Sequence, residues 1–296
     1  MSAYRACVGG YVGGGHVHPA LLDAARERLA AAKESGAVAD GYVARCGDDI
    51  DLMLLHDGRS CDARSIARDV FGAAASAGSR LRQHGNGGVE IDGVELSLAP
   101  RPSEPVLFFF SNRSVRGAWS LLAYRMLADP FVTPGLVGDA AMREGFRFTV
   151  RDPDGSYDLP ADLYRFLAAV GRGARTVEVR SRTTDEIAAV VSGGTDPVLV
   201  VRCESPFPGV EDALEAFSVE GSSMGLAPVS ANADSTTRSI PRAIGLGFQV
   251  TPERLVGPRD LLGDAAFEEQ RREAVAAARR TRNGAAIQPR EVPAAI

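Results

Sequence analysis

The stretch Val106–Phe110, with the sequence VLFFF, decides the predicted fold class. An unbroken apolar run of this length predicts a central strand that is covered on both faces. Before it, the alternating pattern of Val89–Leu98 predicts a half-exposed strand, which is ended by Pro102. After it, a helix is predicted over Ala118–Leu127. A buried strand with helical sequence beside it indicates an α/β protein.

The N-terminal region predicts a strand, a helix and a hairpin in succession. A buried strand is expected over Tyr4–Val12, followed by a glycine-rich turn. Apolar residues then recur at helical spacing over Ala20–Lys33, which predicts an amphipathic helix that lies on a sheet. Two further strands, Tyr42–Cys46 and Ile50–His56, are separated by Gly-Asp-Asp and predict a hairpin.

The remainder of the chain continues to alternate helices and strands. Asp62 is placed to cap a helix that runs to about Leu81. Further strands are predicted over Phe146–Val150, Thr176–Arg180, Ile187–Val191, Val198–Cys203 and Ala243–Val250, and further helices over Ala161–Val170, Val210–Phe217 and Ala265–Arg280. No Pro/Ser-rich linker divides this pattern, so we predict one domain over residues 1–281 and a mobile tail over residues 282–296.

Composition and charge exclude several classes of protein. The chain has 296 residues, of which 45% are hydrophobic and 24% charged, as is ordinary for a globular protein. A net charge of -5 argues against a nucleic-acid-binding surface. No apolar run reaches the roughly 18 residues of a membrane span. The first ten residues, MSAYRACVGG, lack the pattern of a signal peptide, so we expect a cytoplasmic protein with no membrane partner.

The cysteines and the lysine limit the available chemistry. The four cysteines, Cys7, Cys46, Cys61 and Cys203, show no CxxC spacing, which argues against a zinc motif and favours reduced thiols. Lys33 is the only lysine among 33 basic side chains. A mechanism that needs a lysine amine therefore has a single candidate, and no motif indicates an organic cofactor.

Five motifs carry a family resemblance. They are VGGYVGGGHVHP from Val8, CGDDIDL from Cys46, ADPFVTPGLV from Ala128, IGLGF from Ile244 and RLVGPRDLL from Arg254. In this order they resemble the archaeal-type bifunctional fructose-1,6-bisphosphate aldolase/phosphatase family, from about Arg5 to Arg272. The resemblance implies a four-layer α-β-β-α sandwich, a cytoplasmic homo-oligomer that is typically an octamer, and an ancestral site for a phosphorylated sugar.

The aldolase half of that family depends on a Schiff-base lysine, which this sequence lacks at the matching position. The matching stretch is Val191–Pro197, where Gly194 stands in place of the lysine. Lys33 lies at the polar end of the first predicted helix and is expected to be solvated. Covalent amine catalysis needs the amine in the pocket, so we expect no ordinary Schiff-base aldolase activity.

The phosphatase half of the family uses several magnesium ions, and its ligand set is only partly present. The resemblance makes Asp48, Asp49 and Asp196 candidate metal ligands. Four other positions differ: Cys7 and Asn112 replace carboxylates, Gly14 replaces a histidine, and Thr195 stands beside Asp196. The region around Gln83, where the family has a glutamine ligand, is shortened. With fewer carboxylates we expect at most one Mg²⁺ or other divalent ion.

Several candidate residues have two interpretations. Asp48 and Asp49 could bind a metal or transfer protons, or they could be ordinary turn residues. His16 and His18 could bind an anion or act as acid and base, or they could lie in a polar helix entry. Cys7 could be a nucleophile or a soft-metal ligand, but a strand cysteine is more often a core residue.

A second group of residues is predicted to bind substrate. Arg113 and Arg238 match phosphate-binding positions of the family, and guanidinium groups suit phosphate or carboxylate. Gly14 would leave space for a ligand, and Asn112 and Thr195 are expected to line the same pocket.

Three functional hypotheses follow. The leading hypothesis is a divergent enzyme that acts on a small anionic metabolite by acid/base chemistry of the lyase or cyclase type, as in specialised biosynthesis. The first alternative is a magnesium-dependent sugar-bisphosphate phosphatase with a reduced metal site. The second alternative is a non-catalytic ligand-binding or partner subunit.

Overall fold

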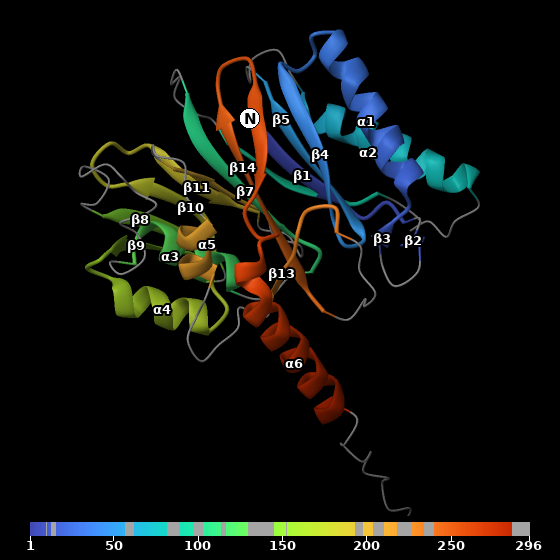
Figure 1. Cartoon of the computed structure of the whole chain (residues 1–296). Coiled ribbons are helices and arrows are strands. Elements are labelled where there is room, and N and C mark those ends of the chain that lie inside the picture. Colours follow the sequence, from blue (N-terminus) through green and yellow to red (C-terminus); the bar gives the residue numbers. More distant parts are fainter. Residues whose placement is uncertain are drawn as a thin grey trace, which may run out of the picture.

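The computed structural model describes most of the chain. The described residues are 1–9, 11–12, 16–56, 62–81, 89–96, 103–113, 117–129, 145–151, 153–192, 198–203, 210–217, 226–233 and 240–285. Within them, six α-helices accompany two large sheets whose strands are almost all antiparallel (Figure 1). The chain is therefore a mixed α/β protein, as the sequence predicted.

The smaller sheet has four strands in the order β4-β5-β1-β6. Their bounds are β4 Asp40–Cys46, β5 Asp49–Leu55, β1 Ser2–Ala6 and β6 Ile91–Glu95. Successive side chains of a strand point to opposite faces. In β5, Leu52 and Leu54 join one buried cluster, whereas Met53 and Leu55 join another, so both faces of this sheet are covered.

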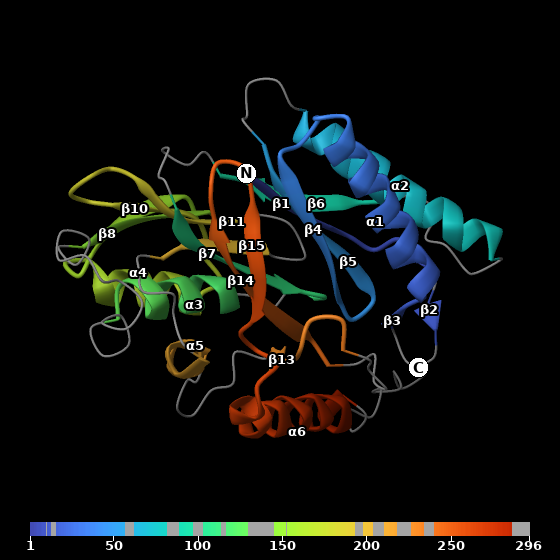
Figure 2. The same ribbon diagram turned by 45° about the horizontal axis from the view of Figure 1, so that its top comes forward.

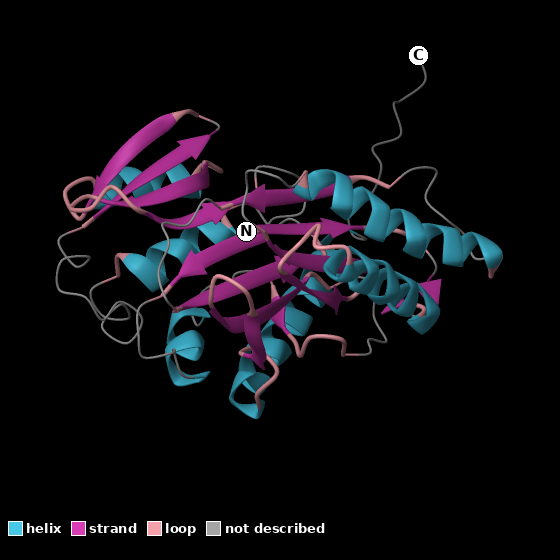
Figure 3. Ribbon diagram, turned by 90° about the horizontal axis from the view of Figure 1, so that it is seen from above, coloured by secondary structure: helices cyan, strands magenta, loops and turns pink. Residues whose placement is uncertain are grey.

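Two long helices cover one face of the smaller sheet. These are α1 (Pro19–Glu34) and α2 (Ala63–Arg80), which lie side by side (Figures 2 and 3). The Asp62 side chain accepts a hydrogen bond from the backbone of Ser65, which confirms the predicted cap of α2. His18 caps α1 in the same way, and Pro19 occupies the first helical position.

The larger sheet has nine strands, with the order β13-β14-β7-β12-β11-β10-β8-β9 and with β15 paired to β14. Their bounds are β7 Glu104–Ser111, β8 Phe146–Arg151, β9 Gly155–Leu159, β10 Arg175–Ser181, β11 Ile187–Val191, β12 Val198–Arg202, β13 Ala227–Pro228, β14 Arg242–Val250 and β15 Leu255–Asp260. The VLFFF segment lies in β7, between β14 and β12, which confirms that it forms a central strand.

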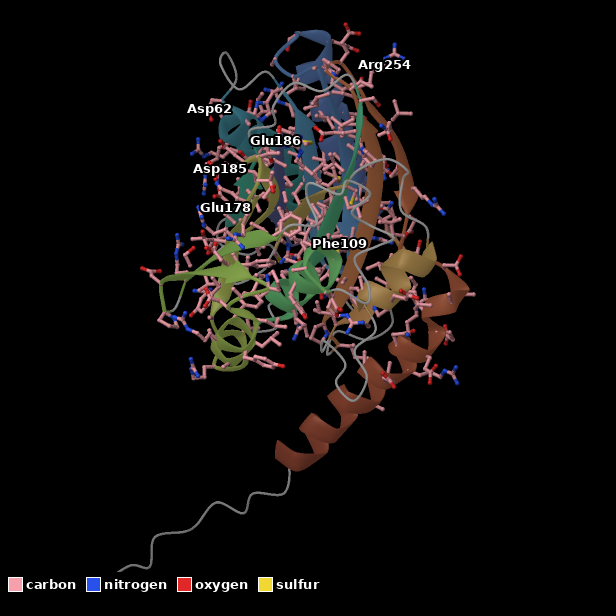
Figure 4. All side chains as sticks on the ribbon, turned by 90° about the vertical axis from the view of Figure 1, so that its left-hand side faces the viewer. Asp62, Phe109, Glu178, Asp185, Glu186 and Arg254 are labelled. Atoms are coloured by element: carbon pink, nitrogen blue, oxygen red, sulfur yellow. The ribbon has the colours of Figure 1, made fainter. Side chains whose placement is uncertain are left out.

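Alternation along β7 divides the interior into two cores. Phe108 and Phe110 pack between the two sheets, whereas Leu107 and Phe109 face a second group of helices, and Figure 4 labels Phe109. The helices of that group are α3 (Ala118–Leu127), α4 (Leu163–Gly171) and α5 (Val210–Phe217). The packing order is therefore α1 and α2, the smaller sheet, the larger sheet, and then α3 to α5.

The C-terminal described segment is the helix α6 (Glu268–Ala285), which follows a 3-10 turn over Ala265–Phe267. Ala274 on this helix packs with Ala227 and Ile240, while the rest of α6 extends from the body in Figure 1. The predicted domain end at residue 281 thus falls within a helix, and residues 286–296 lie outside the described part. None of the helices in the described residues is long and apolar enough to cross a membrane.

The structure differs from the predicted elements at two places. The strand predicted over Tyr4–Val12 is split, because β1 ends at Ala6 and Gly9 has a φ of 77°. The two-residue strand β2 (Tyr11–Val12) then pairs with β3 (His16–Val17) instead. Three strands of the larger sheet, β9, β13 and β15, were not predicted. The strand β13 has only two residues, and β9 and β15 carry polar residues or Pro and Gly on an edge of the sheet.

Candidate functional site

The β4–β5 hairpin places two adjacent aspartates in different surroundings. Gly47 turns the chain with a φ of 63°, a conformation that favours glycine. Asp48 is half-buried, whereas Asp49 is buried and begins β5 opposite Cys46. Because side chains alternate along a strand, Asp49 and Asp51 point to the same face of the sheet.

A buried arginine lies beside both carboxyl groups on that face. Arg5 lies opposite Asp51 in the register of β1 and β5, and its guanidinium forms an ion pair with Asp49. Its Nε lies 3.9 Å from Oδ1 of Asp51. Burial raises the pKa of Asp51 to about 8, and the charge of Arg5 opposes this rise. Arg5 therefore acts as an internal cation beneath the hairpin.

Asp48 is held by an amide from the other sheet. Nδ2 of Asn112 donates a hydrogen bond of 3.0 Å to Oδ1 of Asp48. Oδ1 of Asn112 accepts a hydrogen bond of 2.8 Å from the backbone N–H of Arg242. Asn112 follows β7 and Arg242 begins β14, so these contacts join the hairpin of the smaller sheet to two central strands of the larger one.

Two arginines contribute positive charge to this region. The Arg242 side chain is buried beside the turn, where a Cβ built on Gly47 would lie 3.0 Å from its Nη1. Burial lowers the pKa of Arg242, the charge of Asp48 raises it, and the charge of Arg113 lowers it again. Asp48 and Arg113 are therefore both within electrostatic range of Arg242. Arg113 is exposed, and among the site residues that the structure describes Asp48 is the one carboxylate that is not buried.

The entry to α1 is tied to the same hairpin. Nη1 of Arg45 in β4 donates a hydrogen bond of 3.3 Å to the carbonyl of Val17, and Nη2 of Arg45 donates to the carbonyl of Asn232. Nδ1 of the next residue, His18, accepts a hydrogen bond of 3.1 Å from the backbone of Ala20. In the neutral imidazole this bond places the proton on Nε2.

The structure brings some of the predicted site residues together and leaves others undescribed. Asp48 contacts Asn112 directly, and Arg113 lies within electrostatic range of Arg242. Cys7 is half-buried and directly follows β1. The side chain of His16 and all of Gly14, Thr195, Asp196 and Arg238 lie outside the described residues.

Sequence reasoning missed two arginines of this site, Arg5 and Arg242. Each is a charged residue within a strand that is otherwise largely apolar, and that contrast is the signal that could have found it. A buried charge needs a partner, so such positions predict a polar cluster. Lys33 instead forms an ion pair of 2.6 Å with Asp40 and is 43% exposed, in accordance with the expected solvated position.

The described residues do not fit a cluster of several metal ions. They contain no group of three or more His, Cys, Asp or Glu side chains that could hold a metal. Asp49 is paired with Arg5, and Oδ1 of Asp48 accepts an N–H bond from Asn112. Guanidinium and amide nitrogens are donors and do not ligate hard cations.

Comparison with known proteins matches nearly the whole chain to one family. A family model described as fructose-1,6-bisphosphatase matches residues 1–295. A relative from Moorella thermoacetica is 36% identical over 99% of this chain and 88% of its own length. One from Sulfurisphaera tokodaii is 36% identical over 92% of this chain and 82% of its own length. One from Methanocaldococcus jannaschii is 33% identical over 100% of this chain and 87% of its own length. All three are named fructose-1,6-bisphosphate aldolase/phosphatase.

Proposed function

Because this chain belongs to the fructose-1,6-bisphosphatase family, which includes the aldolase/phosphatase relatives, we propose that it is a divergent enzyme of that family with a different substrate. Its substrate is a small anionic metabolite. Its chemistry is acid/base catalysis of the lyase or cyclase type, without a lysine Schiff base, and its setting is specialised biosynthesis.

The observation that carries this proposal is the position of Asp48 among donors. Nδ2 of Asn112 lies 3.0 Å from Oδ1 of Asp48 and orients that carboxylate, and Arg242 lies beside the turn that carries Asp48. Arg242 and Arg113 would bind the anionic group of the substrate, because guanidinium groups form paired hydrogen bonds with carboxylate and phosphate. Asp48 would then move a proton of the bound substrate.

His18 has a different role in this proposal. Its Nδ1 is occupied by the backbone N–H of Ala20, so only Nε2 can face a ligand. In the neutral ring Nε2 carries the proton, which makes His18 a hydrogen-bond donor to an anionic group or an acid toward a leaving group. Arg238 would help to orient the substrate, and the other predicted residues, His16, Cys7, Gly14 and Thr195, would complete the pocket.

The absence of Schiff-base chemistry is supported by the position of Lys33. Its ammonium group pairs with Asp40 at the C-terminal end of α1, and Asp40 also accepts a hydrogen bond from the backbone of Leu255. The amine is therefore engaged in joining elements of the fold. No second lysine exists in the sequence to replace it.

The proposal can be tested with a thermal-shift screen of small carboxylates and sugar phosphates on the purified chain, with and without Mg²⁺. Binding of an anion raises the melting temperature by mass action. We expect Arg113→Ala to bind the anion at least about ten-fold more weakly, because a charge-assisted pair is lost, and therefore to show a smaller rise in melting temperature. Arg254→Ala is the matched control, since Arg254 is an exposed arginine on a different turn (Figure 4).

A hit from the screen would then be tested for turnover. We expect Asp48→Asn to abolish conversion while the ligand still binds, because the amide keeps the shape of the carboxylate but does not accept a proton. Full turnover in Asp48→Asn and in His18→Ala would show that the proposed roles are wrong. Binding without any conversion by the wild type would favour the non-catalytic ligand-binding alternative.

Membership of the family favours a second candidate, a magnesium-dependent sugar-bisphosphate phosphatase. Asp48, Asp49 and Asp196 would hold one Mg²⁺, which would supply charge neutralisation at the phosphate. This candidate predicts release of phosphate from fructose-1,6-bisphosphate that requires Mg²⁺ and is lost in Asp49→Asn. No release at millimolar Mg²⁺ would exclude it.

The remaining family features belong to the same proposal. The observed order of helices and sheets would be the α-β-β-α sandwich of the family, and the protein would be a cytoplasmic homo-oligomer, with the octamer as the expected assembly. Analytical ultracentrifugation of the full chain measures the assembly directly.

A further inference from the structure

We propose that Asn112 determines the ligand specificity of this site: it makes the Asp48 site receive anions directly, without a bound divalent cation. The inference rests on the proposed function for the location of the site. The test of this inference measures ion binding, whereas the proposed function is tested by anion binding and turnover, so either can fail without the other.

The orientation of the Asn112 amide is fixed by its two partners. Nδ2 faces a carboxylate oxygen of Asp48, which only accepts, and Oδ1 faces the backbone N–H of Arg242, which only donates. A flipped amide would place two acceptors together and two donors together. Asn112 is also only 7% exposed, so its side chain has little freedom to turn away.

This fixed orientation disfavours a cation at Asp48. The N–H of Asn112 occupies a lone pair of Oδ1 of Asp48, which a metal ion would otherwise use. The amide oxygen, which could ligate a hard cation, is directed at the backbone of Arg242. The guanidinium group of Arg5 pairs with Asp49, that of Arg242 lies beside the Gly47 turn, and Arg113 is close enough to affect the charge of Arg242; these positive charges repel a divalent cation.

Asp49, the second carboxylate of the hairpin, does not provide the missing ligand for a cation. Asp49 is buried and paired with Arg5, so its charge is already neutralised by a group of the chain itself. The described part of the site therefore contains donors and positive charge around a single accessible carboxylate. Such a set suits a carboxylate or phosphate ligand.

The same geometry predicts what one substitution would do. In Asn112→Asp, the oxygen that replaces Nδ2 would lie about as near to Asp48 as the present hydrogen bond of 3.0 Å. Two carboxylates at this distance repel each other and together form a ligand pair for a hard cation. The other oxygen of the new aspartate would still accept the N–H of Arg242, so the backbone contact would remain.

The test is a titration of the full chain with Mn²⁺, a probe for oxygen-ligand sites, followed by electron paramagnetic resonance. We expect Asp48→Asn to leave Mn²⁺ binding by the wild type unchanged. Asn112→Asp should bind Mn²⁺ at least about ten-fold more tightly than the wild type, because affinity rises with the number of charged ligands. The double variant Asn112→Asp/Asp48→Asn should lose this gain.

Asn232→Asp is the matched control, since it adds the same charge at another asparagine and should leave Mn²⁺ binding unchanged. The proposal is overturned if Asp48→Asn weakens Mn²⁺ binding to the wild type, or if a folded Asn112→Asp gains no affinity. If Asn112→Asp does not fold, the comparison of the wild type with Asp48→Asn still decides the question. A screen in which no anion binds would count against the proposed function, not against this inference.

Discussion

Gly47 illustrates how a single residue sets the geometry of the site. Its φ of 63° makes the turn that presents Asp48, and its missing side chain gives room to the neighbouring sheet. A Cβ at this position would lie 2.8 Å from Nδ2 of Asn112 and 3.0 Å from Nη1 of Arg242. The first of these atoms is buried and has a fixed orientation, so it cannot give way without breaking its bond to Asp48.

We therefore predict that Gly47→Ala damages both stability and ligand binding. A non-glycine residue in the left-handed region costs about 1–2 kcal/mol, and the contact with Asn112 adds to this cost. Gly36→Ala is the matched control, because Gly36 has a φ of 72° with nothing within 4 Å of its built Cβ. Both variants should lower the melting temperature, but only Gly47→Ala should also reduce the anion-induced shift. Equal effects on ligand binding would contradict the proposed geometry.

The residues of the site differ in how far the sequence could predict them. The family resemblance implies Asp48, Asn112 and Arg113, because each matches a functional position of the family. Arg5 and Arg242 were not predicted, because their importance depends on pairing between positions far apart in the chain. The backbone N–H of Arg242, for example, donates to the side chain of Asn112, which is 130 positions away. Alternation within a strand assigns a side chain to a face, but it does not identify the group opposite.

At the scale of elements, Asp40 joins three parts of the fold. Its carboxylate lies 2.6 Å from Nζ of Lys33, at the end of α1. It also accepts hydrogen bonds from the backbone N–H of Gly41 in β4 and from that of Leu255 at the start of β15. Burial alone would raise the pKa of Asp40, but the hydrogen bonds from Lys33, Leu255 and Gly41 outweigh it and lower the pKa. The ionised form is therefore the one that stabilises the fold.

This direction of shift predicts the pH dependence of Asp40→Asn. A carboxylate with a lowered pKa contributes stability above its unfolded pKa of about 3.9 and loses it as the pH falls through its folded pKa. We expect the substitution to cost about 1.5–3 kcal/mol at pH 7, as for hydrogen bonds to a charged group. Urea unfolding should show the cost shrinking below about pH 4. Asp69→Asn, which removes an exposed pair with Arg28, should have no measurable effect at either pH.

The elements themselves were predicted best where pattern and end signals agreed. The helix predicted from the Asp62 cap to about Leu81 is observed as α2, and the helix over Ala118–Leu127 has the predicted bounds. The helix predicted over Ala20–Lys33 is α1, which is one residue longer at each end. Prediction failed where strands were short or lay on an edge. The pairing of β2 with β3 and the edge strands β9 and β15 depend on neighbours in space, because their own sequences lack an apolar period.

At the scale of the whole molecule, the two sheets share a core that neither could form alone. Phe108 from the larger sheet packs edge-to-face with Phe248 at 5.8 Å, and Met53 and Leu55 of the smaller sheet complete the same cluster. Separation of the sheets would expose this whole cluster to water. The prediction of one continuous domain therefore implies a single cooperative unfolding transition.

Cooperative unfolding can be tested with Trp119 and Phe71, which lie in two different hydrophobic clusters. Trp119 is the only tryptophan and packs against Phe109 on the helical side of the larger sheet. Phe71 is fully buried between α2 and the smaller sheet. Phe71→Ala should cost about 3–5 kcal/mol, the range for a buried aromatic side chain. If unfolding is cooperative, Trp119 fluorescence and far-UV circular dichroism should shift together to the same lower urea midpoint.

The control for this experiment is Arg68→Ala, an exposed substitution on the same helix, which should leave both midpoints unchanged. A Trp119 midpoint that stays at the wild-type value in Phe71→Ala, while the dichroism transition splits, would show that the two sheets unfold separately. Because the site joins Asp48 of one sheet to Asn112 and Arg242 of the other, separate unfolding would also dismantle the site before the larger sheet unfolds. Coincident midpoints would instead mean that the stability of α2 and of the site depend on the same transition.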